Sequence, residues 1–124
     1  MPELIIEVDP RLGAAAQTRQ VLDERFRGEV ADDLLQDLLV VVSELVNNSV
    51  LHGPQDGPIQ TFVLVDEEGL VQGKVEDGGD PSKAIPAAKA DLGPGLQIVD
   101  ALVGRWAADG STVWFEMRSE DGSG

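Results

Sequence analysis

The feature that most constrains the fold is a long apolar stripe between Ala31 and Leu51. Acidic residues at its start suit the positive end of a helix dipole, and Gly53 and Pro54 end it. We therefore expect a helix of more than five turns with a wide apolar face. The apolar side chains recur at the spacing of one helix face; they are Leu34, Leu35, Leu38, Leu39, Val42, Leu45 and Val46.

The other periodic segments predict a sheet packed against helices. Helix formers without an internal proline predict a helix from about Arg11 to Arg27 and a shorter one over Leu96–Val103. Consecutive strands joined by tight turns favour hairpins. We therefore expect an α/β (α+β) two-layer sandwich, whose mixed, mostly antiparallel sheet has helices on one face. Five segments match the composition of strands: Leu4–Val8, Ile59–Val65, Leu70–Val75, Arg105–Ala108 and Thr112–Met117.

Length and charge limit the class of protein. For a chain of 124 residues, we expect one domain over residues 1–118 and a frayed tail over residues 119–124. The chain has 23 Asp and Glu against 9 Lys and Arg, a formal charge of −14. This balance argues against direct nucleic-acid binding, because phosphate backbones are held by basic stripes. With no cysteine and only His52, the sequence excludes disulfides and Cys-zinc sites but not a Mg²⁺ ion held by oxygen ligands.

The sequence gives no indication of a membrane or of export. We expect no membrane-spanning segment, because no run approaches the roughly 20 apolar residues that such a span requires. The N-terminal residues Met1, Pro2 and Glu3 lack the basic and apolar regions of a signal peptide. We therefore expect a soluble, cytoplasmic protein.

Three polar clusters interrupt this scaffold, and the first lies in the second half of the long helix. Glu44 and Asn48 are four residues apart and therefore share one helix face. A carboxylate beside an amide can offer oxygen ligands to a hard cation, or accept a proton next to it. The alternative is a solvated helix face without a chemical role.

The second cluster follows a strand. Asp77 is followed by Gly78 and Gly79, so its carboxylate can accept a hydrogen bond where the backbone approaches a flat ring closely. An ordinary acidic turn is the alternative, since Asp-Gly pairs are common in turns.

The third cluster leads into the last helix. Gly93, Pro94 and Gly95 come directly before Leu96, and the free N–H groups at a helix start bind anions such as phosphate. A glycine-proline turn before an ordinary helix would give the same pattern.

In this order the three clusters resemble the GHKL ATPase superfamily, which has the Bergerat ATP-binding fold. Its pattern is an asparagine on a helix, then Asp-x-Gly after a strand, then Gly-x-Gly-Leu opening a helix. Within it, the sequences Glu44–Asn48, Leu96–Leu102 and Thr112–Glu116 are similar to the small actinobacterial-type anti-sigma factors, which are serine kinases. The resemblance extends from Pro2 to Met117.

The resemblance implies roles for the residues near the phosphates of ATP. Asn48 would bind Mg²⁺, and Glu44 would be the general base. Gly93 and Gly95 would be the lid glycines that cradle the phosphates, and Leu96 would follow them in the nucleotide site.

The resemblance also implies an adenine pocket. Asp77 would hydrogen-bond the adenine amino group, with Gly79 against the ring. Thr112, at the turn into the last strand, would support that aspartate through water.

The function implied by the resemblance is an ATP-dependent protein serine kinase with Mg²⁺ as its metal. Such a protein sequesters a sigma factor and phosphorylates a STAS-type anti-sigma-factor antagonist. The helix over Arg11–Arg27, with the neighbouring sheet edge, is a candidate surface for a homodimer or another partner.

Two departures from the pattern support an alternative function. Residue 94 is proline, which removes one N–H from the phosphate side, and the segment between Asp80 and Gly93 is short and rich in alanine. Both features suit a non-catalytic GHKL-like binding module that regulates transcription only by occluding its partner.

Overall fold

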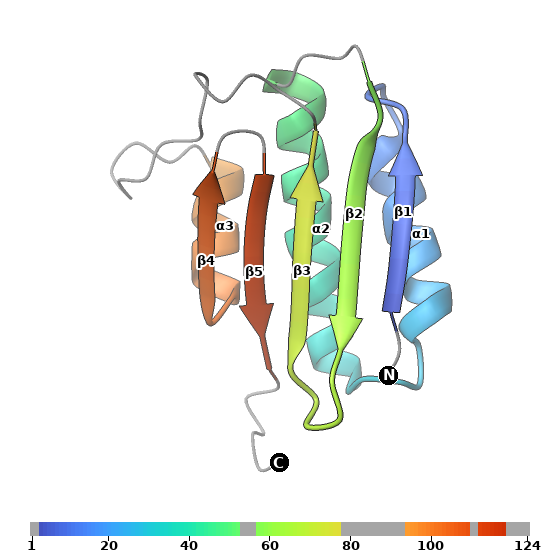
Figure 1. Ribbon diagram of the computed structural model, residues 1–124, viewed down its shortest axis with the longest axis vertical. Helices are drawn as coiled ribbons and strands as arrows, with labels where there is room; N and C mark the ends of the chain where they lie inside the picture. Colours follow the sequence, from blue (N-terminus) through green and yellow to red (C-terminus); the bar gives the residue numbers. More distant parts are fainter. Residues whose placement is uncertain (1–2, 53–56, 78–93, 110–111, 119–124) are drawn as a thin grey trace.

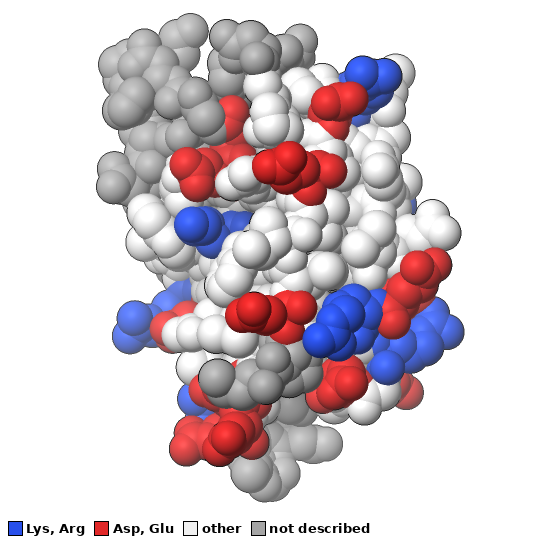
Figure 2. Space-filling view, turned by 45° about the vertical axis from the view of Figure 1, so that its right-hand side comes forward, with Lys and Arg blue, Asp and Glu red and all other residues white. Residues whose placement is uncertain are grey.

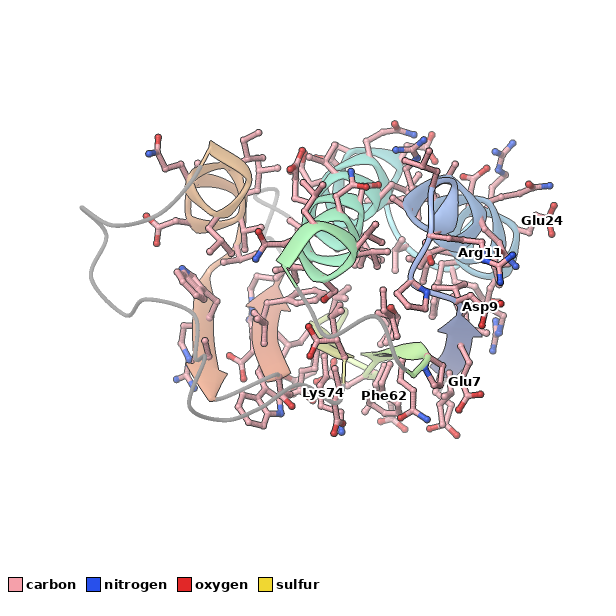
Figure 3. All side chains as sticks on the ribbon, turned by 90° about the horizontal axis from the view of Figure 1, so that it is seen from above. Glu7, Asp9, Arg11, Glu24, Phe62 and Lys74 are labelled. Carbon is pink, nitrogen blue, oxygen red and sulfur yellow. The ribbon has the colours of Figure 1, made fainter. Side chains whose placement is uncertain are left out.

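The computed structural model describes residues 3–52, 57–77, 94–109 and 112–118, which form two layers (Figure 1). All the described helices cover the same face of one sheet (Figure 3), which confirms the predicted two-layer α+β sandwich. The expected tail, residues 119–124, lies outside the described residues. The helices are α1 (Ala14–Phe26), α2 (Asp32–His52) and α3 (Pro94–Leu102). The strands are β1 (Glu3–Val8), β2 (Ile59–Val65), β3 (Val71–Glu76), β4 (Arg105–Asp109) and β5 (Thr112–Met117).

The sheet has the strand order β1-β2-β3-β5-β4, and each neighbouring pair is antiparallel. The antiparallel part of the prediction is confirmed, whereas the described strands contain none of the parallel pairs that a mixed sheet would have. The reason is that α1 and α2 together connect β1 to β2. The two helices run in opposite directions, so the chain comes back to the end of the sheet where β1 finishes, and β2 then runs antiparallel beside β1 (Figure 1). β5 is inserted between β3 and β4, which places the last strand beside the middle of the sheet.

Helix α2, which the apolar stripe predicts, lies at the centre of the core. Leu38, Val41, Val42 and Val46 have no exposed surface, and α1 and α3 lie on either side of α2 over the sheet (Figure 3). By length and composition alone, residues Asp32–Leu51 would be able to cross a membrane, which corrects our expectation that no segment would. In this fold the sheet and the two flanking helices cover the apolar face of α2, as expected for the core helix of a two-layer domain.

Helix α1 begins at Ala14 rather than at Arg11. Gly13, directly before it, has the left-handed conformation with φ of 91°, which glycine adopts without steric cost. The residues before Gly13 therefore belong to the turn after β1 and not to the helix. Leu22 and Phe26 of α1 have no exposed surface and belong to the hydrophobic core.

The turn between β2 and β3 is held by one side chain. The Asp66 carboxylate accepts hydrogen bonds from the backbone N–H groups of Glu68 (2.8 Å) and Leu70 (3.0 Å). Gly69 supplies the positive φ, 86°, that the turn needs. The predicted hairpin is confirmed, and the turn chemistry fixes its register.

Gly73 leaves room in the sheet for an aromatic ring. It pairs with Phe115 of β5, and a Cβ atom at Gly73 would lie 2.1 Å from Cζ of that ring. Because Phe115 is 2% exposed, the ring has no free space into which it could move. Phe115 therefore fills the volume over β3 that a side chain at residue 73 would need.

The face of the sheet away from the helices carries a row of largely apolar side chains. The row consists of Ile5, Phe62, Lys74, Trp114 and Ala107, each paired with the next across neighbouring strands. Figure 3 shows Phe62 and Lys74 pointing away from the helices. Ile5 and Trp114 are 65% and 43% exposed, and Figure 2 shows a largely uncharged area between acidic side chains on this side of the molecule. Exposed apolar surface of this kind is typical of a contact with another protein.

We expect Gly73→Ala to lower the free energy of unfolding by about 1–3 kcal/mol, because the added methyl group overpacks the core against Phe115. Urea unfolding of the variant and the wild type measures the loss. In a Phe115→Leu background, where the ring is absent, the same Gly73→Ala change should cost less. Equal losses in the two backgrounds would contradict the role assigned to the ring. Gly104→Ala is the matched control, since the nearest atom to its added Cβ lies at 3.4 Å.

Candidate functional site

Those predicted site residues that the structure describes lie on, or directly after, four elements that meet at one end of the molecule. α2 and β3 finish at this end, whereas α3 and β5 begin there (the upper end in Figure 1). α2 packs against α3, and β3 pairs with β5. The fold therefore places the elements that carry or border the three polar clusters at the same end of the molecule.

A close approach between Glu44 of α2 and Gly95 of α3 joins two of the clusters. A Cβ atom built on Gly95 would lie 2.7 Å from Oε2 of Glu44, so the carboxylate lies directly against the first turn of α3. Glu44 is partly buried, and it makes no hydrogen bond or ion pair with the residues that the structure describes. The positive end of the α3 dipole favours a negative charge at this position.

Asn48 lies one turn beyond Glu44 on α2 and is also partly buried. The helix places both residues on one face, as their spacing predicts. Their oxygen atoms are ligands that Mg²⁺ accepts. Over the described ranges, no three His, Asp or Glu side chains are grouped so that they could hold a metal ion. Glu44 and Asn48 would offer a Mg²⁺ ion one or two protein ligands, and phosphate and water would have to supply the rest.

Asp77 and Thr112 lie at the same end of two neighbouring strands. Thr112 is paired with Glu76, the last residue of β3, and Asp77 is the next residue along the chain. Both side chains are partly buried. Thr112 is the first residue of β5, so the register of this strand pair, rather than a turn, holds it beside the end of β3.

The third cluster is described only from its proline onward. α3 begins at Pro94 and not at Leu96, because proline suits the first position of a helix, where no N–H is needed and φ is already fixed. Leu96 is 5% exposed and belongs to the hydrophobic core, so it anchors α3 to the rest of the domain. Gly79 and Gly93, predicted to contact nucleotide, lie outside the described residues.

One interaction near the site was not predicted from the sequence. Nε1 of Trp106 in β4 donates a hydrogen bond to Oδ1 of Asp100 in α3 at 2.9 Å. The bond ties the second half of α3 to the edge strand, which helps to fix the first turn of α3 beside Glu44. A polar residue on the last helix, followed after a short turn by a strand tryptophan, is the signal that could have indicated it.

Comparison with known proteins finds a similar solved structure but no similar family model or curated sequence. No protein-family model matches the chain, and no curated protein sequence matches it either. The chain is similar to the crystal structure of the RsbU and RsbW domains of Rv1364c from Mycobacterium tuberculosis, with a TM-score of 0.73 and 26% sequence identity. The match covers 95% of this chain but 32% of that one, so the chain spans about a third of its structural neighbour. The similarity supports the two-layer fold over nearly the whole chain.

Glu44→Gln and Asn48→Ala are each expected to change the free energy of unfolding by less than about 0.5 kcal/mol. Both side chains are partly buried and make no hydrogen bond within the described residues, so the fold loses little without them. Leu38→Ala, on the buried side of the same helix, should cost about 2–5 kcal/mol and serves as the control. Urea unfolding measures all three. A loss above about 1 kcal/mol for either polar variant would mean that the residue is part of the scaffold.

Proposed function

We propose that this chain is an ATP-binding anti-sigma regulatory factor that acts as a serine-protein kinase. Two observations support the proposal. The motifs around Glu44, Asp77 and Gly95 resemble those of the GHKL anti-sigma kinases, and the fold is similar to a structure that contains an RsbW domain. The observation that carries it is the contact of Glu44 with the first turn of α3, at the end of the molecule where β3 and β5 also bring Asp77 and Thr112.

In this proposal the nucleotide is held from two sides. Asp77, at the end of β3, accepts a hydrogen bond from the adenine amino group, and Thr112 lies beside that strand end. The start of α3 faces the phosphates, whose negative charge the helix dipole favours. Mg²⁺ held at Asn48 supplies positive charge that offsets the charge on the phosphates.

Glu44 is the proposed proton acceptor. The acceptor serine loses its proton to the Glu44 carboxylate while its oxygen bonds to the γ-phosphorus. The bond from that phosphorus to the bridging oxygen of the departing diphosphate then breaks. A carboxylate that makes no hydrogen bond or ion pair to described residues is free to take this proton.

The proposed partners are a sigma factor, which the chain sequesters, and a STAS-type antagonist, which carries the acceptor serine. We also propose a cytoplasmic location, where both partners act, and a homodimer as the assembly. The exposed apolar row that includes Phe62 and Trp114 lies on the face of the sheet away from the helices. We propose that partner proteins contact this row.

One observation favours a second candidate function. Pro94 is the first residue of α3 and has no N–H to offer a phosphate. A GHKL-like module that binds its partner without transferring phosphate would tolerate this loss. Transfer of radiolabel from γ-labelled ATP to a STAS-type antagonist protein distinguishes the two functions, because an occluding module would leave the antagonist unlabelled.

We expect Glu44→Ala to lower the rate of this transfer by roughly 10²–10⁴-fold, the range for loss of a general base. Nucleotide should still bind, which calorimetry with a non-hydrolysable ATP analogue checks. Glu67→Ala, in the β2–β3 turn at the other end of the sheet, removes the same charge and should leave the rate unaltered. A Glu44→Ala variant with wild-type turnover would remove Glu44 from this role.

Asp77→Ala is expected to weaken ATP binding by about 1.5–3 kcal/mol, the range for a hydrogen bond to a charged group, or roughly 10- to 150-fold in Kd. Calorimetry with ATP and with ITP tests the reason, because inosine lacks the amino group that Asp77 would accept from. Wild type should prefer ATP, and the variant should lose most of that preference. An unchanged preference would show that the adenine does not lie against Asp77.

A further inference from the structure

Gly95 needs an explanation other than backbone conformation. It lies inside α3, where glycine is less favourable than alanine, and among the residues that the structure describes the glycines with positive φ are Gly13, Gly28 and Gly69. The surroundings of Gly95 supply the explanation. A Cβ atom there would meet Oε2 of Glu44 at 2.7 Å, whereas the next nearest atoms, Cδ and Cβ of Glu44, lie at 3.7 and 3.8 Å.

The conflict is therefore confined to the tip of one side chain. An ordinary contact begins at 3.4 Å, so the carboxylate oxygen would have to move by at least 3.4 − 2.7 = 0.7 Å to accept alanine. Glu44 is partly buried and makes no hydrogen bond or ion pair with described residues that would resist the movement. The fold can accept a methyl group at residue 95, but the carboxylate cannot keep its position.

We infer that Gly95 is a positioning residue for Glu44: by lacking a side chain, it lets the carboxylate lie against the first turn of α3, where the acceptor hydroxyl must be deprotonated. This inference rests on the proposed kinase function. It assigns Gly95 to the chemical step, whereas the family resemblance assigns that glycine to the phosphates. A displacement of about 1 Å in a reacting group can cost roughly 10²-fold in rate, so even a small movement of the carboxylate is measurable.

The first experiment tests the contact without nucleotide. The ¹³C resonance of the Glu44 carboxyl carbon is assigned by its loss in Glu44→Gln and then followed in Gly95→Ala. We expect the resonance to shift in Gly95→Ala and to stay in place in Gly104→Ala. Gly104 follows the other end of α3 and has no atom closer than 3.4 Å to an added Cβ. A resonance that does not move in Gly95→Ala overturns the inference.

The second experiment separates the positioning of Glu44 from the binding of phosphate. Radiolabel transfer and nucleotide Kd are measured for wild type, Gly95→Ala, Glu44→Asp and the double variant. Aspartate withdraws the carboxylate by one methylene, roughly 1.5 Å, which removes the conflict with a residue 95 methyl group. We expect Gly95→Ala to slow transfer by about 10²-fold in the wild-type background, but by less than about threefold when Glu44 is already aspartate.

The outcomes distinguish the two roles of Gly95. A rise in Kd as large as the fall in rate, or an equal fall in rate in both backgrounds, would assign Gly95 to the nucleotide and overturn the inference. A wild-type chain that transfers no phosphate overturns the kinase function, and the positioning role with it, even where the carboxyl resonance shifts. A working kinase whose Gly95→Ala variant keeps the wild-type rate overturns only the positioning role.

Discussion

The structure depends on the burial of one face of α2 between the sheet and the two flanking helices. Leu38, Val42 and Val46 have no exposed surface, and each Å² of apolar surface that they bury contributes roughly 25 cal/mol to folding. The same burial fixes the rotation of α2 about its axis. Glu44 and Asn48 are thereby held at the edge of the core, toward the end where β3 finishes and α3 begins.

Most of the elements could be predicted from the sequence, because their signals are local. The stripe in α2 and the turn at Asp66 each depend on residues close together in the chain. The start of α1 could not be placed, since Gly13 interrupts a composition that otherwise suits a helix up to Arg11. The position of β5 between β3 and β4 depends on the pairing of Glu76 with Thr112, and no local pattern encodes a pairing between such distant residues.

The candidate site divides in the same way. The shared face of Glu44 and Asn48 follows from helix geometry, and it could be predicted from a spacing of four residues. The approach of Gly95 to Glu44 depends on how closely α3 packs on α2, and the buried Leu96 and Val99 hold α3 in the core. A glycine before a helix predicts a turn or an anion site, but the sequence does not show which side chain will occupy the space that the glycine leaves.

The contact between Glu44 and the first turn of α3 also explains why a cation would be needed if the proposed nucleotide binds at this end of α3. The chain carries a charge of −14, and charges farther than a Debye length of about 8 Å are largely screened, so local groups decide whether a triphosphate can bind. Glu44 places a carboxylate at the start of α3, where it offsets much of the attraction that the helix dipole, equivalent to roughly half a charge, exerts on phosphate. The dipole alone is therefore too weak to hold the phosphates beside Glu44. In the proposed function a divalent cation held at Asn48, one turn away on the same face of α2, would restore the balance, and the amide and the carboxylate would then act as parts of one electrostatic arrangement.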